Sequence, residues 1–190
     1  MDHLPKCQTM LFSATLNREI HSLAQLSMNE PERIFLHSVE SAKNIEEATN
    51  IYETPAKLTQ YYMLIKPEEK VNTLYSFLKT HQREKIIVFV STCKQVRFLY
   101  ESLKKFRLGL PMFELQGHQK QKKRMAIYFT FCEKKYGVLI CTNIASRGLD
   151  FPKIDWVLQF DIPEDTETYV HRIGRTARFK YEGKGLTFVT

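Results

Sequence analysis

Along residues 58–190, short runs of apolar residues alternate with longer stretches in which apolar residues recur every three or four positions. The runs are typical of buried β-strands, and the longer stretches are typical of helices with one apolar side. Helices are predicted around residues 71–78, 96–106 and 121–133. The predicted strands cover residues 60–65, 85–90, 112–115, 138–141, 156–160 and 186–189.

Strands and helices alternate without a break in this region. This order predicts an α/β fold, with a parallel sheet, right-handed crossovers and helices on both faces. The run Lys85–Val90 is nearly all apolar, as expected of a parallel strand that is covered on both faces. Because open parallel sheets bind ligands beyond the carboxyl ends of their strands, candidate functional residues are expected directly after strands.

The preceding residues are organised differently. Two strand-like segments, residues 8–14 and 33–37, flank a helix that is predicted to begin at about Asn17. This strand–helix–strand unit is too small for a core of its own, so we interpret it as the end of another domain. The predicted organisation is a domain end at 1–37, a linker at 38–57 and a second domain at 58–190.

The composition favours a polyanionic partner inside a cell. The formal net charge of +7 and the pI near 9.2 suggest nucleic acid first and an acidic membrane surface second. No apolar run approaches the roughly 20 residues that span a bilayer, and no signal peptide is recognised. The four cysteines form no C-x-x-C pair, so no zinc site is expected and a reducing compartment fits. We therefore expect a soluble intracellular protein without a membrane partner.

Hydroxyl, amide and basic side chains follow four of the predicted strands. Such groups suit phosphate, whereas a carboxylate such as Asp150 can accept hydrogen bonds from ribose hydroxyls. Helix capping is the structural alternative for Ser13 and Thr15, and a turn is the alternative for Asp150. For Gln121 and Arg124 the alternative is an exposed basic helix start. The candidates are Ser13, Thr15, Thr92, Gly117, Gln121, Arg124, Thr142, Arg147, Gly148 and Asp150.

The stretch Tyr169–Arg178 carries three arginines at intervals of three and is predicted to form one amphipathic helix. Arg172, Arg175 and Arg178 would then fall on roughly one face. Adjacent guanidinium groups repel each other unless anions neutralise them, and a guanidinium can bind two phosphate oxygens at once. A solvated basic face is the alternative, and a phosphate ligand is the first hypothesis.

In their order and spacing, these motifs resemble the series found in the second half of DEAD-box RNA helicases. Residues 156–161 and 163–165 further resemble the nucleolar helicases of ribosome assembly that release small nucleolar RNA from pre-ribosomal RNA. The resemblance implies a RecA-like fold, RNA remodelling driven by ATP, and a role in rRNA processing in the nucleolus. The matching segments are Ser13-Ala14-Thr15, Val88–Thr92, Gln121-x-x-Arg124, Thr142–Asp150 and His171–Arg178.

The resemblance also implies a role for each motif. Arg175 and Arg178 would be arginine fingers that reach the γ-phosphate of ATP when two RecA-like domains close. His171 and Arg172 would belong to the same catalytic group, and Asp150 would hold the ribose. The remaining implied roles are nucleotide binding for Arg147 and Gly148, RNA-backbone binding for Thr92, Gly117, Arg124 and Thr142, and coupling between domains for Ser13, Thr15 and Gln121.

Some features of the family pattern are changed or absent. Asn143 stands where the family commonly has Asp, which is expected to alter a contact between domains, and Ala177 stands where Gly is common. No G-x-x-x-x-G-K-[ST] loop and no Asp-Glu-Ala-Asp sequence occurs. The implied cofactor is ATP with Mg²⁺, held mainly by an amino-terminal RecA-like half that would be the partner of this chain. Alone, the chain is expected to hydrolyse ATP negligibly.

The sequence leaves two other functions open. A non-catalytic RNA-binding scaffold would be favoured by the loss of arginines from the last motif, but all three are present. A helicase that acts on DNA is the other alternative, because recognition of the ribose 2′-hydroxyl cannot be read from a sequence.

Overall fold

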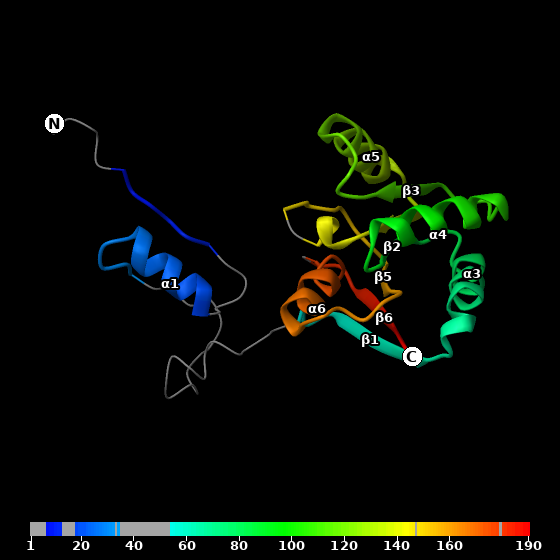
Figure 1. The fold of residues 1–190 in the computed structure, drawn as a ribbon, viewed down its shortest axis with the longest axis horizontal. Coiled ribbons are helices and arrows are strands. Elements are labelled where there is room, and N and C mark those ends of the chain that lie inside the picture. The colour runs from blue at the N-terminus through cyan, green and yellow to red at the C-terminus, as the bar shows by residue number, and fades with distance from the viewer. Residues whose placement is uncertain (1–6, 13–17, 33, 35–53, 147, 179) are drawn as a thin grey trace. The chain divides into compact units, whose positions relative to one another are not determined.

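The computed structural model describes residues 7–12, 18–32, 34, 54–146, 148–178 and 180–190. The chain divides into two compact units, Met1–Glu53 and Thr54–Thr190, which are described separately. Figure 1 shows the elements of both units in the order of the chain.

In the first unit, the described residues form one helix, α1 (Arg18–Ser27), which confirms the helix predicted from about Asn17. The predicted strand at 8–14 is wrong for its described part, because residues 8–12 have no regular structure. A strand needs a hydrogen-bonded neighbour, and no described residue pairs with this segment. The candidates Ser13 and Thr15 lie outside the described residues, as do the predicted strand at 33–37, except Ile34, and most of the linker.

The second unit is built on a six-stranded sheet in the order β1-β6-β5-β2-β4-β3. All neighbouring strands are parallel, so the predicted parallel sheet is confirmed. β2 and β4 are buried along their whole length, which explains their apolar runs. The strands are β1 (Leu58–Leu64), β2 (Lys85–Phe89), β3 (Met112–Leu115), β4 (Gly137–Cys141), β5 (Trp156–Gln159) and β6 (Gly183–Val189).

Helices cover both faces of this sheet, as predicted (Figure 1). Successive residues of β2 point to opposite faces. Val88 packs in one core with Leu99 of α4, and Phe89 packs in the other with Phe131 of α5 and Ile173 of α6. The helices of this unit are η1 (Pro67–Glu69), α3 (Lys70–Thr80), α4 (Cys93–Lys105), α5 (Gln121–Glu133), η2 (Asn143–Ala145) and α6 (Thr166–Ile173).

The strand order reverses next to β2. From β2 the chain passes through α4 to β3 and returns to β4 on one side of β2, and then crosses to β5 on the other side. The loops that follow β2, β4 and β5 therefore meet at the carboxyl edge of the sheet, where open parallel sheets bind ligands. Among the described residues, no helix is both long and apolar enough to cross a bilayer.

Candidate functional site

Helix α6 ends before two of the three arginines. Asp165 caps its first turn, and the helix continues to Ile173. Gly174 follows as the cap residue with a φ of −67°, and the next two residues make tighter hydrogen bonds, from the Arg175 N–H to the Arg172 carbonyl and from the Thr176 N–H to the Ile173 carbonyl. The chain then turns, with Ala177 at a φ of 55°. The prediction of one helix over Tyr169–Arg178 is therefore wrong for its last part, and the three arginines do not share a helical face.

Arg172, the only one of the three arginines within α6, is buried at 2% exposure. Its Nε donates to Asn143 Oδ1 at 2.8 Å, its Nη1 donates to the carbonyl of Asp161 at 2.9 Å, and its guanidinium lies 5.4 Å from the ring centre of Phe89. Burial lowers the pKa of Arg172. These contacts make Arg172 an anchor that holds the end of α6 against the rest of the domain. One of the contacts is with Asn143, which stands where Asp was expected, so Asn143 has a partner within this domain.

Arg175 is half-buried directly after α6. Its Nε donates to the carbonyl of His171 at 3.2 Å, and its Nη1 donates to the carbonyl of Leu149 at 2.6 Å. Burial and then the neighbouring Arg178 lower its pKa to about 10, while Asp150 acts in the opposite direction. The guanidinium therefore stays charged at neutral pH, in surroundings that favour an added negative charge.

Arg178 makes the ion pair of this site. Its Nε donates to the carbonyl of Gly174 at 2.7 Å, and its Nη1 donates to Asp150 Oδ1 at 2.7 Å. The Asp150 side chain is 76% exposed, and within the described part of the chain it is the only carboxylate paired with Arg175 or Arg178. The two guanidinium groups therefore share one exposed carboxylate, which leaves positive charge for an anion.

A small pocket of about 180 Å³ opens beside this arginine pair. Small-molecule sites commonly measure roughly 300–1,000 Å³, so this pocket can hold only part of a nucleotide. Gly148 lies nearby in sequence at a φ of 68°, which favours glycine, and Arg147 lies outside the described residues. The pocket is lined by Phe151, Pro152, Lys153, Ile154, Arg175, Ala177, Arg178 and Tyr181.

The candidate RNA-contacting residues follow the carboxyl ends of β2, β3 and β4. Exposed Thr92 caps α4, since its Oγ1 accepts the N–H of Gln95 at 3.2 Å and its own N–H and hydroxyl donate to Gln95 Oε1, both at 2.9 Å. Half-buried Thr142 directly follows β4. Helix capping was the structural alternative for Ser13 and Thr15, but the structure shows it at Thr92. This cap fixes the conformation of the loop after β2.

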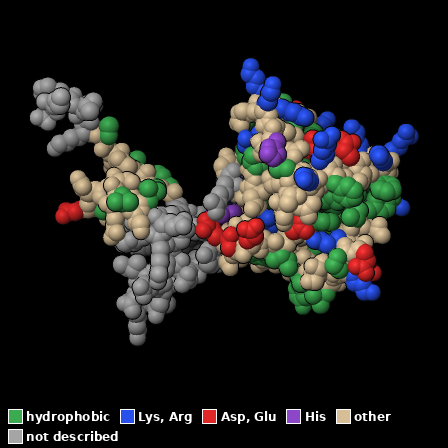
Figure 2. Space-filling model, in the orientation of Figure 1, with side chains coloured by type: hydrophobic (Ala, Val, Ile, Leu, Met, Phe, Trp, Pro, Cys, Tyr) green, Lys and Arg blue, Asp and Glu red, His purple; other side chains and the backbone are tan. Residues whose placement is uncertain are grey.

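The loop after β3 and the start of α5 form a basic rim. Gly117 and Gln121 are exposed, and Arg124 is half-buried. Arg124 Nε has no hydrogen-bond partner among the described residues. Exposed lysines at positions 120, 122 and 123 surround these residues, and Figure 2 shows Lys and Arg side chains along the side of the domain where α5 lies.

Asp161, which follows β5, escaped sequence reasoning. Its carboxylate accepts hydrogen bonds from Lys70 Nζ at 2.6 Å, from the N–H of Ser91 at 3.0 Å and from Gln95 Nε2 at 3.0 Å. Burial alone would raise the pKa of Asp161, but the hydrogen bonds from Lys70 and Ser91 outweigh it, so the pKa is lowered. The signal was its place just beyond a strand, the rule that identified the other candidates.

Comparison with known proteins identifies the family. Residues 69–180 match the family described as the helicase conserved C-terminal domain. The chain belongs to this helicase family. It is 47% identical over 187 residues to the probable ATP-dependent RNA helicase DDX10 of Gallus gallus, and 45% identical over 190 residues to the ATP-dependent RNA helicase DBP4 of Coccidioides immitis. These matches cover 98% and 100% of this chain, but only 20% and 22% of the relatives.

The structure agrees with this assignment. The helicase chain is similar to the DEAD-box helicase Mss116 bound to ssRNA and UDP-BeF, with a TM-score of 0.80, 33% identity, and coverage of 94% of this chain and 35% of that one. The resemblance to the carboxyl-terminal half of DEAD-box helicases and the RecA-like α/β fold are thereby confirmed. The roles of individual residues stay predictions.

The helicase domain shows no metal site in the part that the structure describes, where no group of His, Cys, Asp and Glu is arranged to hold an ion. The four cysteines are free. Cys141 is buried in β4, as expected for an apolar run, whereas Cys93 begins α4 and is half-buried. Mg²⁺ therefore stays a prediction for the complete helicase.

Proposed function

We propose that this domain is half of the catalytic core of an ATP-dependent RNA helicase that remodels RNA duplexes or RNA–protein complexes. The observation that carries the proposal is the pair Arg175 and Arg178, in which Arg178 is ion-paired with exposed Asp150 and Arg175 donates to backbone carbonyls. The arginines act on the γ-phosphate of ATP and Asp150 on its ribose. A guanidinium on a transferring phosphate is worth roughly 10³–10⁵ in rate, about 4–7 kcal/mol.

RNA is the proposed polymer. Thr92, Thr142, Gly117 and Arg124 contact its backbone, which implies little sequence preference. The basic rim at α5 and the RNA bound to the structurally similar Mss116 support this choice. RNA and DNA strands of the same sequence, placed in competition, test it. Equal binding of both strands would favour the alternative of a DNA helicase.

The catalytic core needs a second half. An amino-terminal RecA-like domain supplies the phosphate loop and most Mg²⁺ ligands, because this chain has no phosphate loop and the pocket beside Arg175 and Arg178 is too small for a whole nucleotide. Ser13, Thr15, Gln121 and His171 couple the two halves. The chain alone is therefore inactive, and RNA-stimulated turnover by the isolated chain would overturn this point.

We further propose that the helicase works on pre-rRNA or small nucleolar RNA during ribosome biogenesis in the nucleolus. The resemblance of residues 156–165 to that nucleolar branch supports the proposal. A fluorescent fusion of the full-length protein tests the location. Exclusion of the fusion from the nucleolus would contradict it.

The experiment that tests the catalytic proposal follows ATP hydrolysis by the full-length protein, with and without RNA, for the wild type and Arg175→Ala. We expect strong RNA stimulation that falls by roughly 10³-fold or more in the variant. RNA stimulation that survives the substitution would support the helicase function but assign the arginine finger to Arg178. Retained RNA binding with no hydrolysis in the wild type would make the scaffold function the better one.

A further inference from the structure

Asp161 lies between β5 and α6, where the loops of the carboxyl edge meet. Its side chain is 16% exposed, and each carboxylate oxygen is occupied. Oδ1 accepts the ammonium of Lys70, and Oδ2 accepts both the N–H of Ser91 and the side-chain amide of Gln95. This carboxylate therefore joins α3, the loop after β2 and α4.

The first connection of Asp161 leads to the loop after β2, which carries the proposed RNA contact Thr92. Ser91 is bonded to Asp161 directly, and Gln95 connects Asp161 to Thr92. Gln95 donates to Asp161 through Nε2 and accepts from Thr92 through Oε1, so its amide orientation is fixed at both ends. The conformation of the loop after β2 therefore depends on the position of the Asp161 carboxylate.

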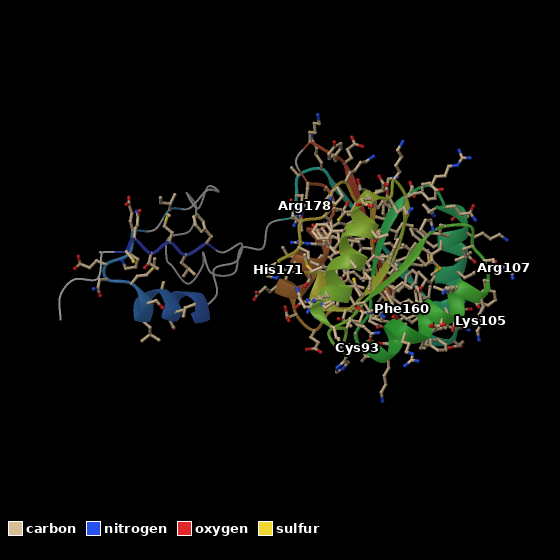
Figure 3. All side chains as sticks on the ribbon, turned by 90° about the horizontal axis from the view of Figure 1, so that it is seen from above. Cys93, Lys105, Arg107, Phe160, His171 and Arg178 are labelled. Carbon is tan, nitrogen blue, oxygen red and sulfur yellow. The ribbon has the colours of Figure 1, made fainter. Side chains whose placement is uncertain are left out.

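The second connection leads to residues 172–178, called the arginine segment below. The backbone carbonyl of Asp161 accepts Arg172 Nη1 at 2.9 Å, and Arg172 also holds Asn143 in the loop after β4. Arg175 follows Arg172 by one turn, through a hydrogen bond from its N–H to the carbonyl of Arg172. In Figure 3, Phe160 marks the residue before Asp161, Cys93 the start of α4, and His171 and Arg178 the arginine segment.

We propose that Asp161 is a positioning residue that makes the RNA-contacting loop and the arginine segment respond as one unit, so that RNA at Thr92 sets the position of Arg175. The proposal rests on the proposed function, because it assigns RNA to one end of the connection and ATP to the other. Asp161 itself touches neither ligand.

The substitution Asp161→Asn tests the connection with almost no change in shape. An amide has one acceptor oxygen and a donor NH₂ group, so the NH₂ must face either Lys70 or the pair Ser91 and Gln95. Two donor groups then face each other, and the hydrogen bonds on that side of residue 161 are lost. The change adds no bulk and leaves the backbone carbonyl that accepts Arg172 in place.

Asp155 provides a matched control at the opposite end of the same strand. Its carboxylate accepts the N–H of Lys85, the first residue of β2, at 2.8 Å and pairs with Lys153 at 3.1 Å. Asp155→Asn therefore disturbs one backbone N–H bond and one lysine pair, the same kinds of contact that Asp161 makes with Ser91 and Lys70, at the amino end of β5. Both variants are expected to lower the melting temperature by similar amounts, which separates lost stability from lost coupling.

The first measurement uses the 190-residue chain and NMR. Without RNA, the amide of Ser91, which donates to Asp161 Oδ2, should exchange with water about tenfold faster in Asp161→Asn than in the wild type or Asp155→Asn, the effect of losing one charged hydrogen bond. Added oligouridylate should shift Thr92 in all three proteins, but shift Arg172 and Arg175 only in the wild type and Asp155→Asn. An equal arginine response in Asp161→Asn would overturn the proposal.

The second measurement uses the full-length protein and RNA-stimulated ATP hydrolysis. In Asp161→Asn, the stimulation by saturating RNA should fall about tenfold while RNA-free hydrolysis is retained, and Asp155→Asn should keep the stimulation. A different result would refute the coupling. The variant would need a higher RNA concentration for half-maximal stimulation but would reach the same maximum, which would mean that Asp161 only supports the RNA-contacting loop. If wild type shows no stimulation, the proposed function fails, and the RNA-free exchange rate of Ser91 still decides whether the Asp161 carboxylate holds the loop after β2.

Discussion

Asn143 provides a direct test of the way in which the arginine segment is anchored. Its Oδ1 accepts Arg172 Nε at 2.8 Å, and Arg172 is buried while Asn143 is exposed. Asn143→Asp would replace a neutral acceptor by a carboxylate on a buried guanidinium. We expect the folded domain to become more stable.

The magnitude follows from the position of the pair. Two unit charges at 4 Å attract each other by about 4 kcal/mol at an effective dielectric constant of 20. The Asn oxygen already supplies part of this attraction, and the desolvation of an exposed carboxylate offsets more of it. A net gain of about 1 kcal/mol remains, which corresponds to a rise of roughly 3–5 °C in melting temperature for a domain of this size.

The stability gained in Asn143→Asp should depend on pH. The guanidinium should hold the pKa of the new carboxyl below the ordinary value for Asp, near 3.9. The added stability is therefore present above about pH 4 and is lost as the pH falls through the lowered pKa. Urea unfolding at pH 7 and pH 3 should show the gain only at pH 7.

Two variants control this comparison. Asn29→Asp introduces the same charge in the other compact unit and should leave the stability of the helicase domain unchanged. Asn143→Ala removes the acceptor and should cost about 1–3 kcal/mol, because Arg172 Nε is left buried without a partner. A gain that is absent at pH 7, or that persists at pH 3, would refute the anchoring role assigned to this pair.

Two further predictions concern the same domain. A Cβ at Gly183 would lie 2.2 Å from Thr176 Oγ1 and 2.3 Å from the Ala177 nitrogen, so Gly183→Ala should destabilise the domain by about 1–3 kcal/mol in urea unfolding. An unchanged midpoint would mean that β6 does not hold the arginine segment. Burial raises the pKa of the Cys141 thiol, so at pH 8 a thiol reagent should label exposed Cys7 rapidly and Cys141 only as fast as the domain opens.

The sheet could be predicted from sequence because its central strands are buried on both faces. The runs in β2 and β4 are apolar at nearly every position, and parallel strands covered on both sides require that pattern. The predicted α5 matches the observed bounds, Gln121–Glu133. The strand predicted at residues 8–14 failed for residues 8–12 because an apolar run does not specify a partner strand.

The end of α6 was missed because the spacing of the arginines continues beyond the helix. Residues 172, 175 and 178 recur every three positions, yet Gly174 follows the last helical residue and Ala177 has positive φ. Gly174 was the available signal, since glycine is among the weakest helix formers. Asp161 was missed for another reason, because its partners Lys70 and Ser91 lie 91 and 70 positions away in the sequence.

The turn after α6 changes what the three arginines can do. On one helical face they would form a uniform basic stripe that any polyanion could bind. In the folded domain, Arg172 is buried as an anchor, while Arg175 and Arg178 are held by the carbonyls of neighbouring residues. Backbone carbonyls carry no net charge, so they fix the direction of a guanidinium without neutralising it. The arrangement therefore keeps two oriented cations beside one exposed carboxylate, which suits an anion delivered by another domain better than a permanently bound ligand.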